Sequence, residues 1–149
     1  MRAVIQRSLQ AKVSVEGKCV GEIQRGIVAL IGINEGDSKA EFDYILDKMI
    51  NLRIFEDEND KMNLSVNDLE LGLLLVPNFT IYGDARKGRR PSFSFGASPS
   101  EAEGIWQEFI AYAKEKYSKI ETGIFRADMK VEILNDGPVT ILLDSDRLF

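Results

Sequence analysis

The pattern of apolar and polar positions predicts four β-strands in the first 33 residues. In one of them Val13 and Val15 alternate with polar neighbours, which is the period-two pattern of a strand with one buried face. Glu16-Gly17-Lys18 is typical of the hairpin turn that follows it. The last segment is almost continuously apolar and predicts a buried strand. The four segments are residues 3–7, 11–15, 19–23 and 26–33.

Two later segments place apolar residues at helical spacing, and each begins with residues that are typical of the start of a helix. Ser38, followed by Glu41, predicts a capping box at the start of the first helix. Ser98, Pro99 and Glu101 predict a second capping box, with proline at the first helical position. We expect both helices to pack one face against the core. The inward positions are Phe42, Ile45, Leu46, Met49 and Ile50 in the first helix and Ala102, Ile105, Trp106, Phe109, Ile110 and Ala113 in the second.

The remaining apolar segments predict further strands. Residues 71–82 form a strand-like run that Pro77 interrupts, because proline has no backbone N–H to donate to a neighbouring strand. We therefore expect a sheet edge or a bulge there, with nearby backbone N–H groups facing a cleft. Residues 129–134 and 139–143 are predicted as two strands joined by a tight hairpin over 135–138. Because strands occur in clusters, the sequence predicts an α+β fold with a mainly antiparallel, barrel-like β-sheet and two amphipathic helices.

The composition excludes several kinds of chemistry. The chain has 149 residues, one cysteine, no histidine and a net charge of −5. These counts exclude a Ser-His-Asp or Cys-His catalytic unit, a His-ligated metal site and an internal disulfide. The acidic charge argues against a general nucleic-acid coat protein. The sequence contains neither a membrane-spanning apolar run nor a signal-peptide pattern, so we expect a single cytoplasmic domain.

Two charged segments have both a structural and a functional interpretation. The acidic residues over 56–60 are typical of a solvated turn, and they lack the ligand spacing of a calcium loop. The segment 83–90 resembles a phosphate loop in its two glycines, but it lacks the required Lys-Ser/Thr pair. Its basic residues form either a solvated loop or a patch for a polyanionic substrate. They are Arg86, Lys87, Arg89 and Arg90.

Two further segments could take part in chemistry. Thr80 carries a hydroxyl just beyond Pro77, but no activating base is near it in the sequence. The bond between Gly137 and Pro138 could be cis, a realistic option only before proline. The two carbonyl oxygens could then lie side by side and accept hydrogen bonds from an ammonium group.

The order of short motifs along the whole chain resembles the D-aminoacyl-tRNA deacylases. The matching segments occur in register and without large gaps, which makes the resemblance specific. They are residues 1–7, 51–55, 79–81, 88–93, 122–125, 127–129 and 135–140.

This resemblance implies an activity and its partners. The family consists of cytoplasmic homodimers that hydrolyse the ester between a D-amino acid and the 3′ end of tRNA, and that also remove glycine mischarged on tRNA-Ala. The chain is therefore expected to be one deacylase-like domain over residues 1–149 that proofreads chirality. Its expected partners are the aminoacylated 3′ end of tRNA and a second copy of the chain, with neither DNA nor a membrane. No cofactor and no metal are implied.

The resemblance also implies roles for individual residues. Gly137 and Pro138 fall in the family segment Asn-x-Gly-Pro-Val-Thr, whose cis Gly-Pro bond enters the active site of the opposite subunit. This backbone gate binds the α-amine and leaves no room for the side chain of an L-amino acid. Arg7 matches the arginine that holds the gate in place. Phe125 and Met129 match positions that line the pocket near the terminal adenosine.

The other family segment, Ser-Gln-Phe-Thr-Leu, stands here as Pro-Asn-Phe-Thr-Ile over 77–81, so any contact of the serine is lost. Phe79 and Thr80 are the catalytic candidates, and Asn78 is a substrate-binding one. An aminoacyl ester is already activated, so catalysis needs mainly a held water and donors for the oxyanion, for which we expect the backbone N–H groups of Phe79 and Thr80. We favour assistance by the 2′-hydroxyl of the terminal adenosine over attack by Thr80.

Two other functions stay open at this point. A non-catalytic RNA-binding module would use the basic residues of 83–90 on phosphates and would show salt-dependent binding without ester hydrolysis. A hydrolase of small esters or amides would depend on Thr80 and would not need tRNA.

Overall fold

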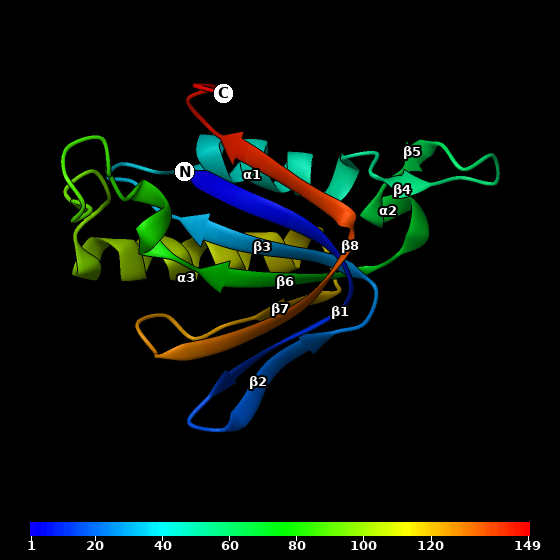
Figure 1. Ribbon diagram of the computed structural model, residues 1–149, viewed down its shortest axis with the longest axis horizontal. Helices are drawn as coiled ribbons and strands as arrows, with labels where there is room; N and C mark the ends of the chain where they lie inside the picture. Colours follow the sequence, from blue (N-terminus) through cyan, green and yellow to red (C-terminus); the bar gives the residue numbers. More distant parts are fainter.

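The computed structural model describes residues 1–149, and its centre is a strongly curled six-stranded sheet (Figure 1). Strand β1 (Arg2–Val15) is long enough to have two antiparallel neighbours on one side, β3 (Gly26–Gly32) along its first half and β2 (Lys18–Ile23) along its second. On the other side it pairs with β8 (Met129–Asp144) along its whole length. The predicted barrel-like α+β fold is confirmed.

Strand β6 (Gly72–Pro77) lies between β3 and β7 (Ile120–Thr122) and is parallel to both, so the sheet is mixed. Pro77 is the last residue of this strand and pairs with β3 alone, so the predicted local edge is confirmed, whereas the predicted bulge is wrong. The last residue of β6 that pairs with β7 is Leu75. At Pro77 the β7 side of the strand has no partner, so no hydrogen bond is lost by the absence of an N–H there. The following N–H, of Asn78, donates to the carbonyl of Ile31 at 2.7 Å.

Strand β8 is one strand and not the two strands and hairpin that the sequence predicts. Both halves pair with β1. The two halves are separated by a bulge: between the pairs Gln6–Thr140 and Ser8–Asn135, β1 has only Arg7 while β8 has residues 136–139. The turn-like residues 135–138 therefore form a bulge opposite Arg7 and not a hairpin.

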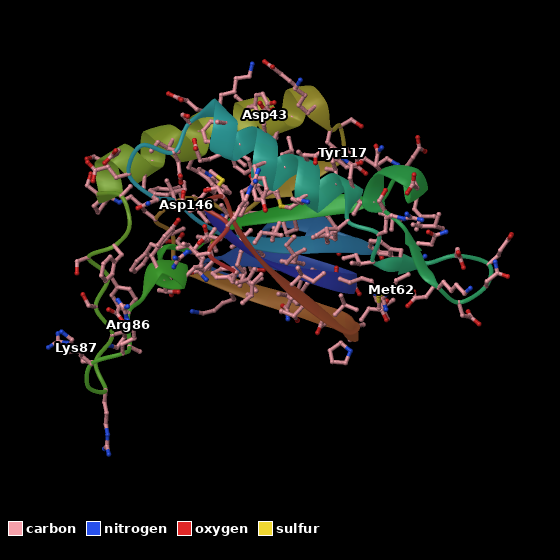
Figure 2. All side chains as sticks on the ribbon, turned by 90° about the horizontal axis from the view of Figure 1, so that it is seen from above. Asp43, Met62, Arg86, Lys87, Tyr117 and Asp146 are labelled. Carbon is pink, nitrogen blue, oxygen red and sulfur yellow. The ribbon has the colours of Figure 1, made fainter.

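Two long helices cover one face of the sheet, which Figure 2 shows from above. Helix α1 (Lys39–Asn51) begins with the predicted capping contact, because the Glu41 carboxylate accepts hydrogen bonds from the backbone N–H and the hydroxyl of Ser38 at 2.8 and 2.9 Å. Helix α3 (Pro99–Lys116) begins where predicted, with Pro99 first, but Ser98 makes no capping bond. The second capping box is therefore wrong.

The core has two parts, one on each face of the central strands. The larger part lies between the sheet and the helices, where Phe42 of α1 meets Phe109 of α3 with ring centroids 5.3 Å apart. The smaller part fills the inside of the curl, on the opposite face of β3 and β6, around Val28 and Leu74. Both faces of β3 are thus covered, which explains its continuous apolar run.

Short elements on the right of Figure 1 complete the fold. Strands β4 (Phe55–Glu56) and β5 (Met62–Leu64) form a small antiparallel ribbon, and α2 (Val66–Leu69) is a short helix that the sequence analysis does not predict. No helix of the chain has the length and apolar character needed to cross a membrane.

Candidate functional site

The segment after β6 is a 3-10 turn, η1 (Phe79–Tyr82), that the side chain of Asn78 caps. The Asn78 Oδ1 atom accepts hydrogen bonds from the backbone N–H of Thr80 at 3.1 Å and from its hydroxyl at 2.6 Å. The sequence prediction offered the Thr80 N–H as a free donor, and in the structure Asn78 occupies it. The side chain of Asn78, which stands where the family segment has the longer Gln, thus stabilises the turn through both hydrogen bonds.

One backbone donor of this turn remains free. The N–H of Phe79 donates to no atom of the protein, because it lies beyond the strand and at the first position of η1. The Phe79 ring is 68% exposed and packs edge-on against Phe93, with centroids 5.3 Å apart. The turn thus presents a backbone donor beside an exposed aromatic ring.

Two cavities adjoin this turn, one of about 450 Å³ and one of about 590 Å³. Phe125 lines the first, while Thr80 and Met129 line the second. Both have Pro77, Asn78, Phe79 and Arg126 in their walls. The structure therefore brings five predicted site residues together around η1, namely Asn78, Phe79, Thr80, Phe125 and Met129. Arg126 was not predicted, and no sequence signal indicates it.

A second cluster of predicted residues surrounds the bulge of β8. The guanidinium of Arg7 is buried, and its Nη1 donates to the carbonyl of Ile54 at 2.6 Å and to the Glu56 carboxylate at 2.8 Å. Its Nε lies 2.9 Å from a carboxylate oxygen of Asp136 as an ion pair, although the angle is not that of a hydrogen bond. Donation from Arg7 holds the pKa of Glu56 below its usual value.

Asn135 closes the bulge from the other side. Its Nδ2 donates to the carbonyls of Arg7 at 2.9 Å and of Val139 at 3.0 Å. Gly137 and Pro138 lie exposed at the tip, and the bond between them is cis. Gly137 has φ +114°, and a Cβ there would lie 2.8 Å from the Val139 side chain and 3.2 Å from Arg7. Only glycine fits this position without strain.

The two clusters do not meet within one chain. Arg7, Gly137 and Pro138 line neither cavity. In Figure 1 the bend of β8 lies on the right beside β4 and α2, whereas η1 follows the tip of β6 on the left. The turn cluster carries a donor and cavities, and the bulge cluster presents an exposed backbone on a buried arginine.

The basic loop, residues 86–90, projects from the body of the molecule near η1 (Figure 2). Its base is tied down by backbone hydrogen bonds between Asp84 and Ser92 in both directions. Arg86 folds back onto Asp84 at 2.8 and 2.9 Å, which lowers the pKa of Asp84 to about 2. Lys87, Arg89 and Arg90 are exposed and form no ion pair, so three positive charges are available to a polyanion.

The acidic segment 56–60 begins at the last residue of β4 and continues as the turn that leads to β5. The Asp57 carboxylate accepts from the backbone N–H groups of Asn59 and Lys61 and from the Asn63 side chain, at 2.8, 3.2 and 3.0 Å. These hydrogen bonds lower the pKa of Asp57. Glu56 instead accepts the hydrogen bond from Arg7 beside the bulge. The sequence gives no sign of this role, because Glu56 stands in a run of acidic residues.

Comparison with known proteins places the chain in a family. The family model described as D-Tyr-tRNA(Tyr) deacylase matches residues 4–144. A D-aminoacyl-tRNA deacylase of Clostridium botulinum (strain Eklund 17B / Type B) is 57% identical over 149 residues, which is 100% of both chains. One of Thermosipho africanus (strain TCF52B) is 54% identical over the same length, again with 100% of both chains covered.

Two solved structures share the fold of this chain. A structure described as c-Myc DNA Unwinding Element Binding Protein has a TM-score of 0.91 at 39% identity, over 97% of this chain and 98% of that chain. A probable eukaryotic D-amino acid tRNA deacylase has a TM-score of 0.78 at 18% identity, over 95% and 97% of the two chains, and this likeness shows the fold alone. The family model and the full-length relatives confirm the resemblance: the chain belongs to the D-Tyr-tRNA(Tyr) deacylase family.

Proposed function

We propose that this protein hydrolyses the ester bond of D-aminoacyl-tRNA in the cytoplasm and releases the free amino acid and tRNA. The family supports the reaction class, and the unpaired N–H of Phe79, a residue that lines both cavities, is the observation that supports the site. A backbone donor that is already oriented stabilises the oxyanion of ester hydrolysis without reorganisation. In this proposal the Phe79 N–H is that donor.

The geometry favours water as the nucleophile over Thr80. The Thr80 hydroxyl donates its proton to the side-chain amide of Asn78, and an amide oxygen is too weak a base to remove that proton. Thr80 is therefore a positioning residue, which through Asn78 keeps the turn in shape. The 2′-hydroxyl of the terminal adenosine, next to the ester, assists the attacking water in its place.

Selection against L-amino acids falls to the bulge of β8. In this proposal a second copy of the chain inserts Gly137 and Pro138 at η1, because the two clusters lie apart within one chain. The exposed carbonyls of the bulge bind the α-amine of the amino acid, and the backbone collides with an L side chain. A steric gate cannot exclude glycine, so glycyl-tRNA-Ala is also a substrate.

Deacylation of matched substrates tests the proposal. The purified protein is expected to release D-tyrosine from tRNA and glycine from tRNA-Ala, and to spare L-tyrosyl-tRNA. D-tyrosyl-tRNA that ends in 2′-deoxyadenosine is expected to be a poor substrate. Equal hydrolysis of the D and L esters would contradict the gate, and full activity on the deoxy substrate would contradict assistance by the RNA.

The same assay addresses the two other functions. Binding of many RNAs without loss of the ester would point to a non-catalytic RNA-binding module. Turnover of small esters that Thr80→Ala abolishes would point to a threonine-dependent hydrolase.

A further inference from the structure

Arg126 occupies a backbone conformation that favours glycine. It lies in the connection between β7 and β8, in a turn that the Ala127 N–H closes onto the carbonyl of Ile124 at 3.3 Å. Its φ is +63°, a left-handed value that L-residues with long side chains rarely adopt. Its side chain is 61% exposed, so packing does not explain arginine at this position. A strained residue at the edge of a site points to function.

Arg126 lies in the walls of both cavities, so it can contact a substrate that occupies either of them. Apart from Pro77, Asn78 and Phe79, it is the residue that both cavities share. If one cavity takes the amino acid and the other takes the terminal base, the arginine borders the link between them.

The charge of Arg126 is largely available. Its ion pair is with Glu103 of α3, at 3.7 Å, and the Glu103 side chain is 49% exposed. A long and solvated pair of this kind contributes little. An anion with better geometry can therefore displace Glu103, and a guanidinium matches a phosphate through two parallel hydrogen bonds.

We propose that Arg126 binds the phosphodiester that joins the terminal nucleotide of the substrate to the rest of the RNA. This proposal rests on the function proposed above, because that phosphate is the fixed anion nearest to the aminoacyl ester. Arg126 is thus a positioning residue that anchors the RNA end while the Phe79 N–H faces the reacting ester.

Arg126→Gly separates this role from a structural one, because glycine relieves the left-handed backbone while it removes the charge. We expect an unchanged or higher melting temperature, about a tenfold higher KM for D-tyrosyl-tRNA, and an unchanged kcat. The slope of log(kcat/KM) against log salt should become shallower by about 0.7. Arg126→Gln should raise KM similarly, because it removes the charge while it keeps a polar side chain at this position.

Arg147→Gly is the matched control, since Arg147 has φ +57°, is exposed and lines neither cavity. It should leave KM unchanged. D-tyrosyladenosine, which has no phosphate, should be hydrolysed equally by the wild type and Arg126→Gly. An active wild type with unchanged KM in Arg126→Gly, or an equal loss on D-tyrosyladenosine, would overturn the role of Arg126. A wild type inactive on both substrates would instead overturn the proposed function, and this inference with it.

Discussion

In the proposed function, the backbone of Phe79 and not its side chain supplies the chemical group that acts on the substrate. Its N–H is free because β6 has ended and η1 has only begun, and the Asn78 amide occupies the next N–H along the chain. A donor of this kind cannot be removed by the usual truncation to alanine. Proline can remove it, because the first position of a helical turn accepts proline and Asn78 before it is already extended, with φ −147° and ψ 94°.

Phe79→Pro is therefore expected to fold and to lose about 100-fold or more in kcat, the usual effect of losing one oxyanion donor. Phe79→Ala is the control, since it removes the same ring and keeps the N–H. Single-turnover deacylation of D-tyrosyl-tRNA by both variants measures the difference. If the two variants lose activity equally, the ring and not the donor matters.

At the scale of elements, the two helix starts look alike in sequence and differ in structure. Glu41 closes a capping box on Ser38, and these hydrogen bonds lower the pKa of its carboxyl. Glu101 stands at the same spacing from Ser98, which makes no capping bond. The extended backbone of Ser38, with φ −141°, allows the box, whereas φ is −59° at Ser98. The spacing predicts where a helix begins, whereas the capping hydrogen bonds depend on the backbone conformation of the residue before the helix.

Glu41→Gln is expected to lower the free energy of unfolding by about 0.5 to 1 kcal/mol at pH 7. Because the folded-state pKa of Glu41 is lowered, its contribution is present above the unfolded value of about 4.3 and disappears as the pH falls through the folded value. The difference from the wild type should therefore shrink below that pH in urea unfolding. Glu101→Gln should change little at either pH, and an equal effect of both substitutions would contradict the assignment.

At the scale of the whole molecule, the proposed site combines the turn of one chain with the bulge of another, because the two clusters lie apart within one chain. Gly137→Ala should disable the bulge, because the new Cβ meets Val139 and Arg7. Phe79→Pro should disable the turn. In a mixed dimer, one site would combine an intact turn with an intact bulge, and the other would have neither.

Co-expression of the Gly137→Ala and Phe79→Pro chains is expected to restore about a quarter of wild-type activity, since about half of randomly formed dimers are mixed and each holds one good site. Deacylation by the unfractionated preparation measures this, and tag-purified mixed dimers should reach about half of wild-type activity, because one of their two sites is good. Each variant expressed alone should stay nearly inactive. A mixed preparation no more active than its parents would mean that turn and bulge act within one chain.

The sequence by itself determined the features that depend on near neighbours. Apolar periodicity predicted both long helices and most strands, the absence of histidine excluded whole classes of mechanism, and short motifs indicated the family. Each of these signals spans a few residues, where backbone preference and side-chain period act directly. The family motifs also indicated Asn78, Phe79, Thr80, Phe125 and Met129 as site residues.

Only the tertiary structure decided the features that depend on which distant segments meet. Residues 135–138 have the composition of a hairpin, yet both halves of β8 pair with β1, and the extra residues bulge over Arg7. Pro77 suggested a sheet edge or a bulge, and only the strand pairing showed that β6 is an interior strand whose β7 side is unpaired at Pro77. Arg126 joined the site because the connection between β7 and β8 lies against η1. Strand pairing and cavity walls are contacts between segments far apart in the chain, so no local pattern encodes them.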